Sequence, residues 1–268
     1  MGLPVTAYIR TLNEARLIGH VVTAARAVAD EVIVVDSGST DDTVAIAEAA
    51  GARVIAQPWL GNGFQKRVGE AAARHDWLLD LDADEIVSRD LAGSIRTLFA
   101  EGAPEHPVYA LDLCLRPPGG PVWRTFFNVP RAKLYDRRVH RQPEHRAWDQ
   151  LPGVDPKRVL LLDGPLIHHG HRDIAQVVAK MNRVSTVRAE ETRRRPMAEI
   201  VARILLGYPA YFFKQYVAKG GWRAGLYGFA LCAVLAQARW LRDVKMYEAR
   251  LGRRADLEAV ETAVADDR

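Results

Sequence analysis

Four carboxylates follow a short apolar run, and their spacing could build a metal site. The segment Trp77-Leu-Leu-Asp-Leu-Asp-Ala-Asp-Glu85 has the length and composition of a buried strand, and it carries Asp80, Asp82, Asp84 and Glu85. Carboxylates crowded where a strand stops repel one another unless a cation lies between them. Hard divalent ions such as Mg²⁺ are commonly held by one or two carboxylates together with substrate phosphate oxygens. The segment therefore suggests a metal–diphosphate site, with a solvated turn before the next helix as the simpler alternative.

The elements that must position these carboxylates are those of a parallel sheet. Apolar and β-branched runs predict strands over residues 5–9, 31–36, 53–56 and 77–81, and helical spacing predicts helices over 17–25, 43–50 and 64–74. Strands that alternate with helices indicate βαβ units with right-handed crossovers. We therefore expect an α/β fold with a doubly wound, mainly parallel sheet, and charged residues at its strand ends should share one crevice.

A second polar group follows the expected strand at 31–36. Asp36 ends this strand, and Ser39, Thr40 and Asp41 begin the next helix. Side-chain oxygens at a helix start commonly cap its free N–H groups. Capping does not account for Asp36, which we expect to point into the crevice and to accept hydrogen bonds from a ribose hydroxyl or a uracil N–H. Neither Gly-x-Gly-x-x-Gly nor Gly-Lys-Ser/Thr follows the first strand, which argues against dinucleotide oxidoreductases and P-loop enzymes.

Composition and charge limit the protein class. The chain has 268 residues, of which 49% are hydrophobic and 26% charged, so it can bury one core or a core with a small appendage. No basic stretch followed by a long apolar run opens the sequence, and we expect a cytoplasmic protein. Cys114 and Cys232 lie in apolar settings typical of reduced thiols. Arg and Lys gather after about residue 115, which favours an acidic partner such as nucleic acid, a sugar nucleotide or anionic lipid.

Four motifs together resemble the family-2 inverting glycosyltransferases. In order along the chain they are Thr11-Leu-Asn-Glu14, the segment 34–43, Gly61-Asn-Gly-Phe-Gln-Lys-Arg67 and the segment 79–85. More narrowly, the sequence is similar to the branch that includes bacterial lipopolysaccharide-core glucosyltransferases. The resemblance is strong over residues 5–90, looser over 125–190 and nearly absent beyond. It implies a GT-A fold, a nucleotide-activated sugar donor, and Mg²⁺ or Mn²⁺ as the cofactor.

The resemblance also implies roles for donor-binding residues. Asp36 would contact the nucleoside base, Asp82 and Asp84 would bracket the ribose, diphosphate and metal, and Asn13 and Glu14 would border the nucleotide pocket. A fixed divalent ion stabilises the charge that develops on a leaving diphosphate. By this logic Asp84 is the direct metal ligand, and Asp82 faces the ribose or the metal.

Three other charged residues belong to the same expected site. Glu85 either supports the surroundings of the metal or caps the next helix. Lys66 and Arg67 could reach the diphosphate, with a solvated helix face as the alternative explanation.

Inversion by single displacement needs a carboxylate that takes the proton of the attacking hydroxyl. The candidates are Asp136, Glu144 and Asp149. They belong to the middle of the chain, where the strands expected over 107–116 and 132–136 would build the acceptor side. In the family that the chain resembles, a His-Glu pair precedes a strand and a histidine. Here the strand expected over 159–163 and the histidine pair that follows it place Trp148-Asp149 where His-Glu would stand. We therefore predict Asp149 as the base and Glu144 as the second choice, with a surface aspartate as the alternative.

Three histidines follow that expected strand. His168, His169 and His171 match no zinc signature, so they are either ordinary loop residues or, for His168, an additional metal ligand.

The carboxyl-terminal third predicts a helical hairpin. Arg193-Arg-Arg-Pro196 marks the end of a catalytic domain of residues 1–195, with a nucleotide-sugar half over about 1–105 and an acceptor half over about 106–195. An amphipathic hairpin follows over 196–250, broken at Gly220-Gly221, and then a polar tail over 251–268 that we expect to be frayed. The uncharged run 224–238 is shorter than the roughly twenty residues of a membrane span. A basic and aromatic hairpin fits an anionic membrane surface, and packing on the catalytic domain or on a second copy of the chain is the alternative.

Together these expectations describe a cytoplasmic, peripherally membrane-associated, metal-dependent inverting glycosyltransferase. It would move a hexose from a UDP-sugar to a glycolipid or lipid-linked saccharide in cell-envelope polysaccharide synthesis, without a nucleic-acid partner. One alternative is a nucleotidyltransferase, which a Gly-rich basic loop after the first strand would favour, and the segment 10–14 is not such a loop. The other is a non-catalytic membrane adaptor, which would bind no sugar nucleotide productively.

Overall fold

The computed structural model describes residues 3–266 except 125, 147 and 192–194, with side chains described as far as residue 252 apart from that of residue 191. The contacts divide the chain into two compact units, Met1–Gly170 and His171–Arg268. Arg193 and Arg194, on which the predicted limit of the catalytic domain partly rests, lie outside the described residues, so that limit stays a prediction.

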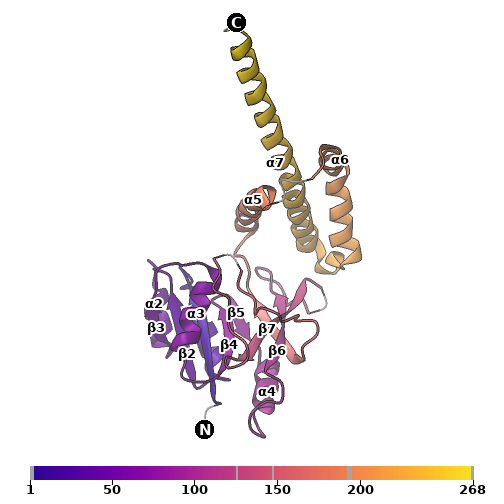
Figure 1. Ribbon diagram of the computed structural model, residues 1–268. Coiled ribbons are helices and arrows are strands. Elements are labelled where there is room, and N and C mark those ends of the chain that lie inside the picture. Colours follow the sequence, from indigo (N-terminus) through magenta and orange to yellow (C-terminus); the bar gives the residue numbers. More distant parts are fainter. Residues whose placement is uncertain (1–2, 125, 147, 192–194, 267–268) are drawn as a thin grey trace. The chain divides into compact units, whose positions relative to one another are not determined.

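The first unit is built on one eight-stranded sheet (Figure 1). Its strands are β1 (Val5–Thr11), β2 (Glu31–Asp36), β3 (Arg53–Ala56), β4 (Trp77–Asp82), β5 (Glu85–Val87), β6 (Val108–Leu115), β7 (Asn128–Asp136) and β8 (Leu161–His168). The order is β3-β2-β1-β4-β7-β6-β8-β5. Neighbours among β1 to β4 run parallel, as do β6 and β8, whereas β7 is antiparallel to both of its neighbours and β5 is antiparallel to β8. This arrangement confirms the predicted α/β class with a mostly parallel sheet.

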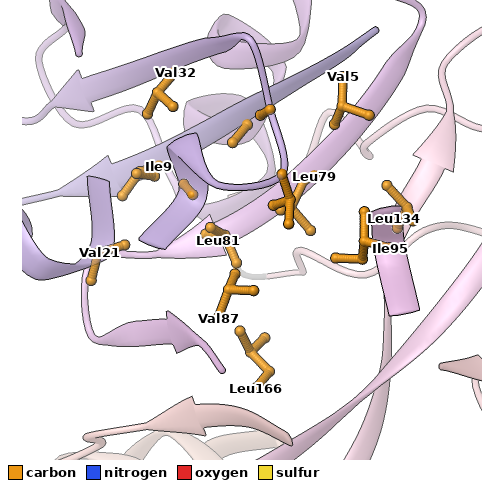
Figure 2. Close-up of a cluster of buried hydrophobic side chains, with 14 of the residues drawn as sticks. Val5, Ile9, Val21, Val32, Leu79, Leu81, Val87, Ile95, Leu134 and Leu166 are labelled. Carbon is orange, nitrogen blue, oxygen red and sulfur yellow. The ribbon is translucent and has the colours of Figure 1, made fainter. Parts of the chain in front are cut away.

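Among its described residues, this unit has the helices α1 (Ile18–Arg26), α2 (Thr43–Ala49), α3 (Asn62–Ala72) and α4 (Arg89–Leu98). Alternate strand residues bury opposite faces of the sheet, because successive side chains of a strand point to opposite sides. Ile9, Leu79 and Leu81 join the cluster with Val21 and Ile95 that Figure 2 shows. Tyr8, Ile33 and Leu78 belong to a second cluster with Tyr135. Two covered faces leave the strand ends as the place for polar side chains.

The strand expected over 159–163 is displaced in the structure. β8 begins at Leu161 and continues through Gly164-Pro165 to His168, although a Gly-Pro pair is a common turn signal. Gly164 has φ 97°, and a Cβ there would lie 2.3 Å from the backbone nitrogen of Leu91 in α4. The close approach of α4 therefore explains the glycine, and the strand extends far enough to include His168.

The second unit consists of helices. They are α5 (Ile174–Glu191), α6 (Met197–Phe213), the π turn η1 (Lys214–Ala218), the short 3₁₀ turn η2 (Gly221–Ala224) and α7 (Gly225–Asp266). The predicted hairpin of α6 and α7 is present, with Gly220 in a left-handed conformation at φ 75° where the chain turns. α5 was not expected from the sequence. The backbone of α7 is helical to Asp266, and the fraying of the tail stays a prediction. One stretch, Gly221–Gly252, is long and apolar enough to cross a membrane, a property shared with core helices of soluble proteins.

Candidate functional site

The polar strand ends of β1, β4 and the short β5 converge in the first unit. Arg10 of β1 stands beside Asp82 of β4 in the parallel register, and Glu85 of β5 stands beside His168 of β8. Asp84 lies in the turn between β4 and β5. The sheet therefore brings the predicted donor carboxylates together with a histidine that is more than eighty residues away in the chain.

Asp84 and His168 form one half of this cluster. Asp84 Oδ2 lies 3.3 Å from His168 Nε2, and both side chains are about a quarter exposed. The backbone N–H of His169 donates to the carbonyl of Asp84 at 2.8 Å, which holds the turn against β8. Burial lowers the pKa of His168, but the hydrogen bond and the charge of Asp84 outweigh it and raise that pKa above its ordinary value.

These two side chains form a donor set that suits a divalent ion shared with a phosphate ligand. Mg²⁺ sites of this kind use one or two protein carboxylates and complete their shell with phosphate oxygens and water. Within the described residues, no group of three or more His, Cys, Asp or Glu side chains is arranged to hold a metal ion. The chain itself therefore offers an oxygen and a nitrogen at this point, and the remaining ligands would come from substrate or solvent.

Asp82 is held by an arginine that the sequence analysis did not assign. The Nε of Arg10 donates to Asp82 Oδ1 at 2.6 Å and its Nη2 to Oδ2 at 3.2 Å. The same guanidinium donates to Asn62 Oδ1 at 2.8 Å, and its Nη2 lies 2.8 Å from Asp149 Oδ2. Burial raises the pKa of Asp82, yet the charges of Lys133, Lys66 and Arg10 hold it well below its usual range. The predicted metal contact of Asp82 stays a prediction, because in this structure its carboxylate is engaged by Arg10.

Asp149 reaches this cluster because the loop before it is seated on the start of α3. The N–H of Asn62 donates to the carbonyl of Arg146 at 2.7 Å, and the N–H of Gly63 donates to that of His145 at 2.9 Å. These are free N–H groups of a helix amino terminus, which must find acceptors. A Cβ on Gly63 would lie 2.2 Å from the Pro143 carbonyl oxygen. The segment Gly61-Asn-Gly63 therefore holds the loop that precedes Asp149 against the start of α3.

The other candidate bases lie elsewhere. Glu144 is 67% exposed and pairs with Arg67 at 3.2 Å. Asp136 stands beside Trp77 at the opposite end of β4 from Asp82, about 17 Å away at ~3.3 Å per residue. The structure thus brings Asp149, and neither alternative, to the donor carboxylates.

Lys66 and Glu85 occupy the floor of the site. Lys66 is buried, with Nζ 2.7 Å from Asp80 Oδ2 and 3.7 Å from Asp149 Oδ2, so a solvated helix face is the wrong explanation for it. Glu85 is also buried, accepts the N–H of Asp82 at 2.9 Å and pairs with Lys133 at 2.6 Å. Burial raises the pKa of Glu85 to about 7 against the opposing charge of Lys133.

Glu85 thus supports the turn between β4 and β5, and it does not cap the next helix. Ser88 caps α4 instead, through its hydroxyl and the N–H of Leu91. Arg67 lies at the rim, paired with Glu70 and Glu144.

The predicted nucleotide residues meet at the ends of β1 and β2. Asp36 Oδ2 accepts the N–H groups of Gly38 at 3.0 Å and Ser39 at 2.9 Å. Asn13, at φ 53°, donates its N–H to Ser39 Oγ at 2.9 Å, and the N–H of Glu14 donates to Thr43 Oγ1 at 2.8 Å. Asp36 therefore holds the turn at Gly38 and Ser39, which lies before the start of α2 at Thr43 and is not a helix cap. Its contact with a nucleobase stays a prediction.

Comparisons with known proteins agree with the sequence motifs. The profile of the family described as Glycosyl transferase family 2 matches residues 6–151. An uncharacterized glycosyltransferase of Rickettsia felis is 32% identical over 256 residues, which cover 92% of this chain and 90% of the relative. The lipopolysaccharide core biosynthesis glycosyltransferase LpsC of Rhizobium meliloti is 27% identical over 92% of this chain and 93% of the relative. Among solved structures, glucosyl-3-phosphoglycerate synthase of Mycobacterium tuberculosis in complex with Mn²⁺, UDP and glucosyl-3-phosphoglycerate aligns over 44% of this chain and 45% of that chain, with 28% identity and a TM-score of 0.34.

Proposed function

The chain belongs to glycosyl transferase family 2 and is a glycosyltransferase with a GT-A-type fold, and from this premise we propose its reaction. The protein is a metal-dependent inverting enzyme that moves a hexose from a nucleoside diphosphate sugar, with UDP as the nucleotide, to a glycolipid or lipid-linked saccharide. Similarity over nearly the whole chain to a lipopolysaccharide core biosynthesis glycosyltransferase supports an acceptor of the cell envelope. The proposed place of action is the cytoplasmic face of the cell membrane.

One observation carries this proposal, namely the contact of Asp149 with the guanidinium that also binds Asp82 (2.8 Å and 2.6 Å). Asp149, predicted as the base, and Asp82, predicted to bind the donor, are 67 residues apart in the chain, yet both contact Arg10. An inverting transfer requires this proximity, since the base must stand beside the sugar carbon that the donor residues position.

Each group of the site then has a defined task. Asp149 accepts the proton of the acceptor hydroxyl, whose oxygen attacks the anomeric carbon from the face opposite the diphosphate. The bond between that carbon and the diphosphate oxygen breaks, and the nucleoside diphosphate leaves with the bonding electrons. Asp84 and His168 would hold the divalent ion, which supplies charge stabilisation for the leaving group. Arg10 fixes Asp82 and Asp149 relative to each other. The buried Lys66 balances the charge of Asp80, and the buried Lys133 balances that of Glu85.

The proposal is tested with Asp149→Asn in the full-length protein. We expect donor affinity, measured by calorimetry with a UDP-sugar and Mn²⁺, to stay within a few-fold of the wild type. Release of UDP in the presence of acceptor should fall by roughly 10²- to 10⁴-fold, the usual contribution of a general base. The matched control is Glu144→Gln, whose exposed side chain should be dispensable for transfer.

Two results would contradict the proposal. A fully active Asp149→Asn variant would remove Asp149 as the base. A folded wild-type protein that gains no thermal stability from any sugar nucleotide with Mn²⁺ would favour the non-catalytic adaptor, because a ligand of the folded state raises its apparent stability.

A further inference from the structure

One face of α3 holds the loop that leads to Asp149. Residues four apart in a helix stand one above another, so Asn62, Lys66 and Glu70 share this face. The N–H of Asn62 donates to a carbonyl of the loop at 2.7 Å, and Lys66 Nζ donates to the carbonyl of Asp149 at 3.4 Å. Glu70, further along the same face, meets the beginning of the loop.

Glu70 is a fully buried carboxylate that binds the first residues of this loop. Its Oε2 accepts the main-chain N–H of Gln142 at 2.8 Å, and its Oε1 accepts from Arg141 Nε at 2.6 Å. Arg67 Nη1 donates to the same Oε1 at 3.1 Å. Hydrogen bonds with a charged partner are roughly twice as strong as neutral ones. The carboxylate therefore fixes the start of the loop to α3.

The side chain of Gln142 closes a ring of buried hydrogen bonds with Glu70. Its Nε2 donates to the Tyr8 hydroxyl at 2.9 Å, which lies 2.9 Å from the hydroxyl of Tyr135. The Tyr135 hydroxyl donates to Glu70 Oε2 at 3.3 Å. Burial and the charge of Glu70 hold the pKa of Tyr135 well above its ordinary value, so this hydroxyl remains a donor. Loss of one member would leave buried polar groups without partners, which is costly, so Gln142 is held in one position.

The position of Gln142 bears on that of Asp149. The two residues are seven positions apart, and the amino terminus of α3 holds the loop again between them. Gln142 Nε2 also donates to Asp80 Oδ2 at 3.3 Å. The same oxygen accepts from Lys66, whose Nζ lies 3.7 Å from Asp149 Oδ2. Misplacement of a reacting group by about 1 Å can lower a rate about 10²-fold, so this path from Glu70 to Asp149 bears on transfer.

We propose that Glu70 is the positioning residue for Asp149, because it fixes the start of the loop that carries this carboxylate. Glu70 acts through the loop and takes no proton itself. The inference rests on the proposed function, in which Asp149 is the base, and it assigns a role in transfer to a buried carboxylate outside the donor site.

The test compares two substitutions of the same kind in the full-length protein. Glu70→Gln keeps the size of the side chain and removes its charge. Glu31→Gln, at the end of β2 remote from the site, is the matched control. Glu31 likewise accepts a main-chain N–H, a hydroxyl and a guanidinium, those of Arg74 at 2.7 Å, Thr6 at 2.7 Å and Arg53 at 3.1 Å. Circular dichroism sets a temperature at which both variants are folded.

Hydrogen exchange is the first measurement, and it needs no substrate. A peptide that covers residues 142–149 should exchange on the order of tenfold faster in Glu70→Gln than in the wild type, because the N–H of Gln142 loses its charged acceptor. Glu31→Gln should leave the exchange of this peptide unchanged. Equally faster exchange in both variants would overturn the proposal, since it would show a general loss of stability.

Transfer is measured with UDP-glucose and Mn²⁺ on the donor side and core-truncated lipopolysaccharide as the acceptor. The kcat of Glu70→Gln should fall by on the order of 10- to 10²-fold, with the KM for UDP-glucose within a few-fold of the wild type. In the Asp149→Asn background the same substitution should have almost no further effect, because a positioning residue acts through the group that it positions. A fall of equal size in both backgrounds would overturn the proposal.

A milder pair of variants decides the question if Glu70→Gln does not fold. Arg141→Gln removes one charged donor to Glu70 from a side chain that is 56% exposed. Arg138→Gln removes a comparable donor to Asp136 from a side chain that is 62% exposed. Faster exchange of the loop and a few-fold lower kcat should appear in Arg141→Gln alone, and identical behaviour of the two variants would overturn the proposal.

The proposed function can fail separately from this inference. Full activity of Asp149→Asn, together with loop exchange that depends on Glu70, would refute the proposed base and leave Glu70 as the anchor of the loop. Loss of transfer in Asp149→Asn, together with a normal kcat in Glu70→Gln, would overturn the inference and leave the proposed reaction standing.

Discussion

Arg10→Gln tests the central electrostatic claim about the site. The substitution removes the positive charge that lies 2.6 Å from Asp82 and 2.8 Å from Asp149. Removal of one partner of a buried ion pair costs about 3–5 kcal/mol. The three side chains retain between 18% and 28% of their exposure, so solvent screens part of this loss and we expect a value near the lower limit, about 3 kcal/mol. Urea unfolding at pH 7, followed by circular dichroism, measures it.

The pH dependence of the unfolding free energy tests the role of Arg10 in a second, independent way. The pKa of Asp82 is depressed in the folded protein, in part by Arg10. A group with a depressed pKa contributes stability above its unfolded-state value of about 3.9 and loses that contribution as the pH falls through the folded-state value. The difference in unfolding free energy between wild type and Arg10→Gln should therefore be largest near neutrality and shrink below pH of about 4.

An exposed arginine provides the control for this measurement. Arg158 pairs with Asp155 while 87% and 51% of the two side chains remain exposed, and Arg158→Gln should cost about 0–1 kcal/mol. The prediction is refuted if Arg10→Gln lowers the unfolding free energy by no more than Arg158→Gln does. It is also refuted if the loss of unfolding free energy is the same at pH 7 and pH 3.

Two further substitutions separate the parts of the site. Gly63→Val places side-chain atoms against the Pro143 carbonyl, so the loop that precedes Asp149 must move. The rate of UDP release in the presence of acceptor should then fall by on the order of 10²-fold, whereas the donor affinity measured by calorimetry should persist. Gly93→Ala, with open space around the added atom, is its control, and equal activity of the two variants would show that the loop does not depend on this seat. Asp84→Ala should abolish the Mn²⁺-dependent part of UDP-sugar binding in calorimetry, whereas the exposed Asp163→Ala should not; undiminished binding by Asp84→Ala would place the metal elsewhere.

The sequence predicts the first half of the fold because local patterns determine it. Strands with uniform apolar runs and helices with clear spacing lie within a few residues of the predicted bounds from residue 5 to residue 82. Two signals mislead later in the chain. The Gly164-Pro165 pair interrupts the apolar run of β8, and only the passage of α4 over Gly164 explains why a strand continues there. The helix α5 was not predicted although about half of its residues are apolar, since its packing partners lie on α7, much later in the chain.

The sequence points to the residues of the candidate site more readily than to the side chains that each of them contacts. Asp149 could be chosen because the resemblance to the family-2 glycosyltransferases places Trp148-Asp149 where that family has a His-Glu pair. Arg10 and Lys133 could not, because the role of each depends on which residues the register of the sheet places beside it. A buried strand lysine or arginine opposite a known acidic motif is the one signal that would have drawn attention to them.

The position of the strand end predicts different tasks for two neighbouring carboxylates. Asp82 is the last residue of β4, so the parallel register with β1 fixes Arg10 beside it and commits its charge to the protein. Asp84 lies beyond the strand, and the pairing of β5 with β8 gives it His168, a neutral or cationic neighbour at 3.3 Å, in place of an arginine fork. A divalent ion competes poorly with a bidentate guanidinium at 2.6 Å and more readily with a single contact to an imidazole that can itself become a ligand. It follows that loss of Asp82 should first weaken the folded state and the placement of Asp149, whereas loss of Asp84 should first weaken the response to metal. A parallel measurement of unfolding free energy and Mn²⁺-dependent donor binding in Asp82→Asn and Asp84→Asn would separate the two, and identical profiles would contradict this division.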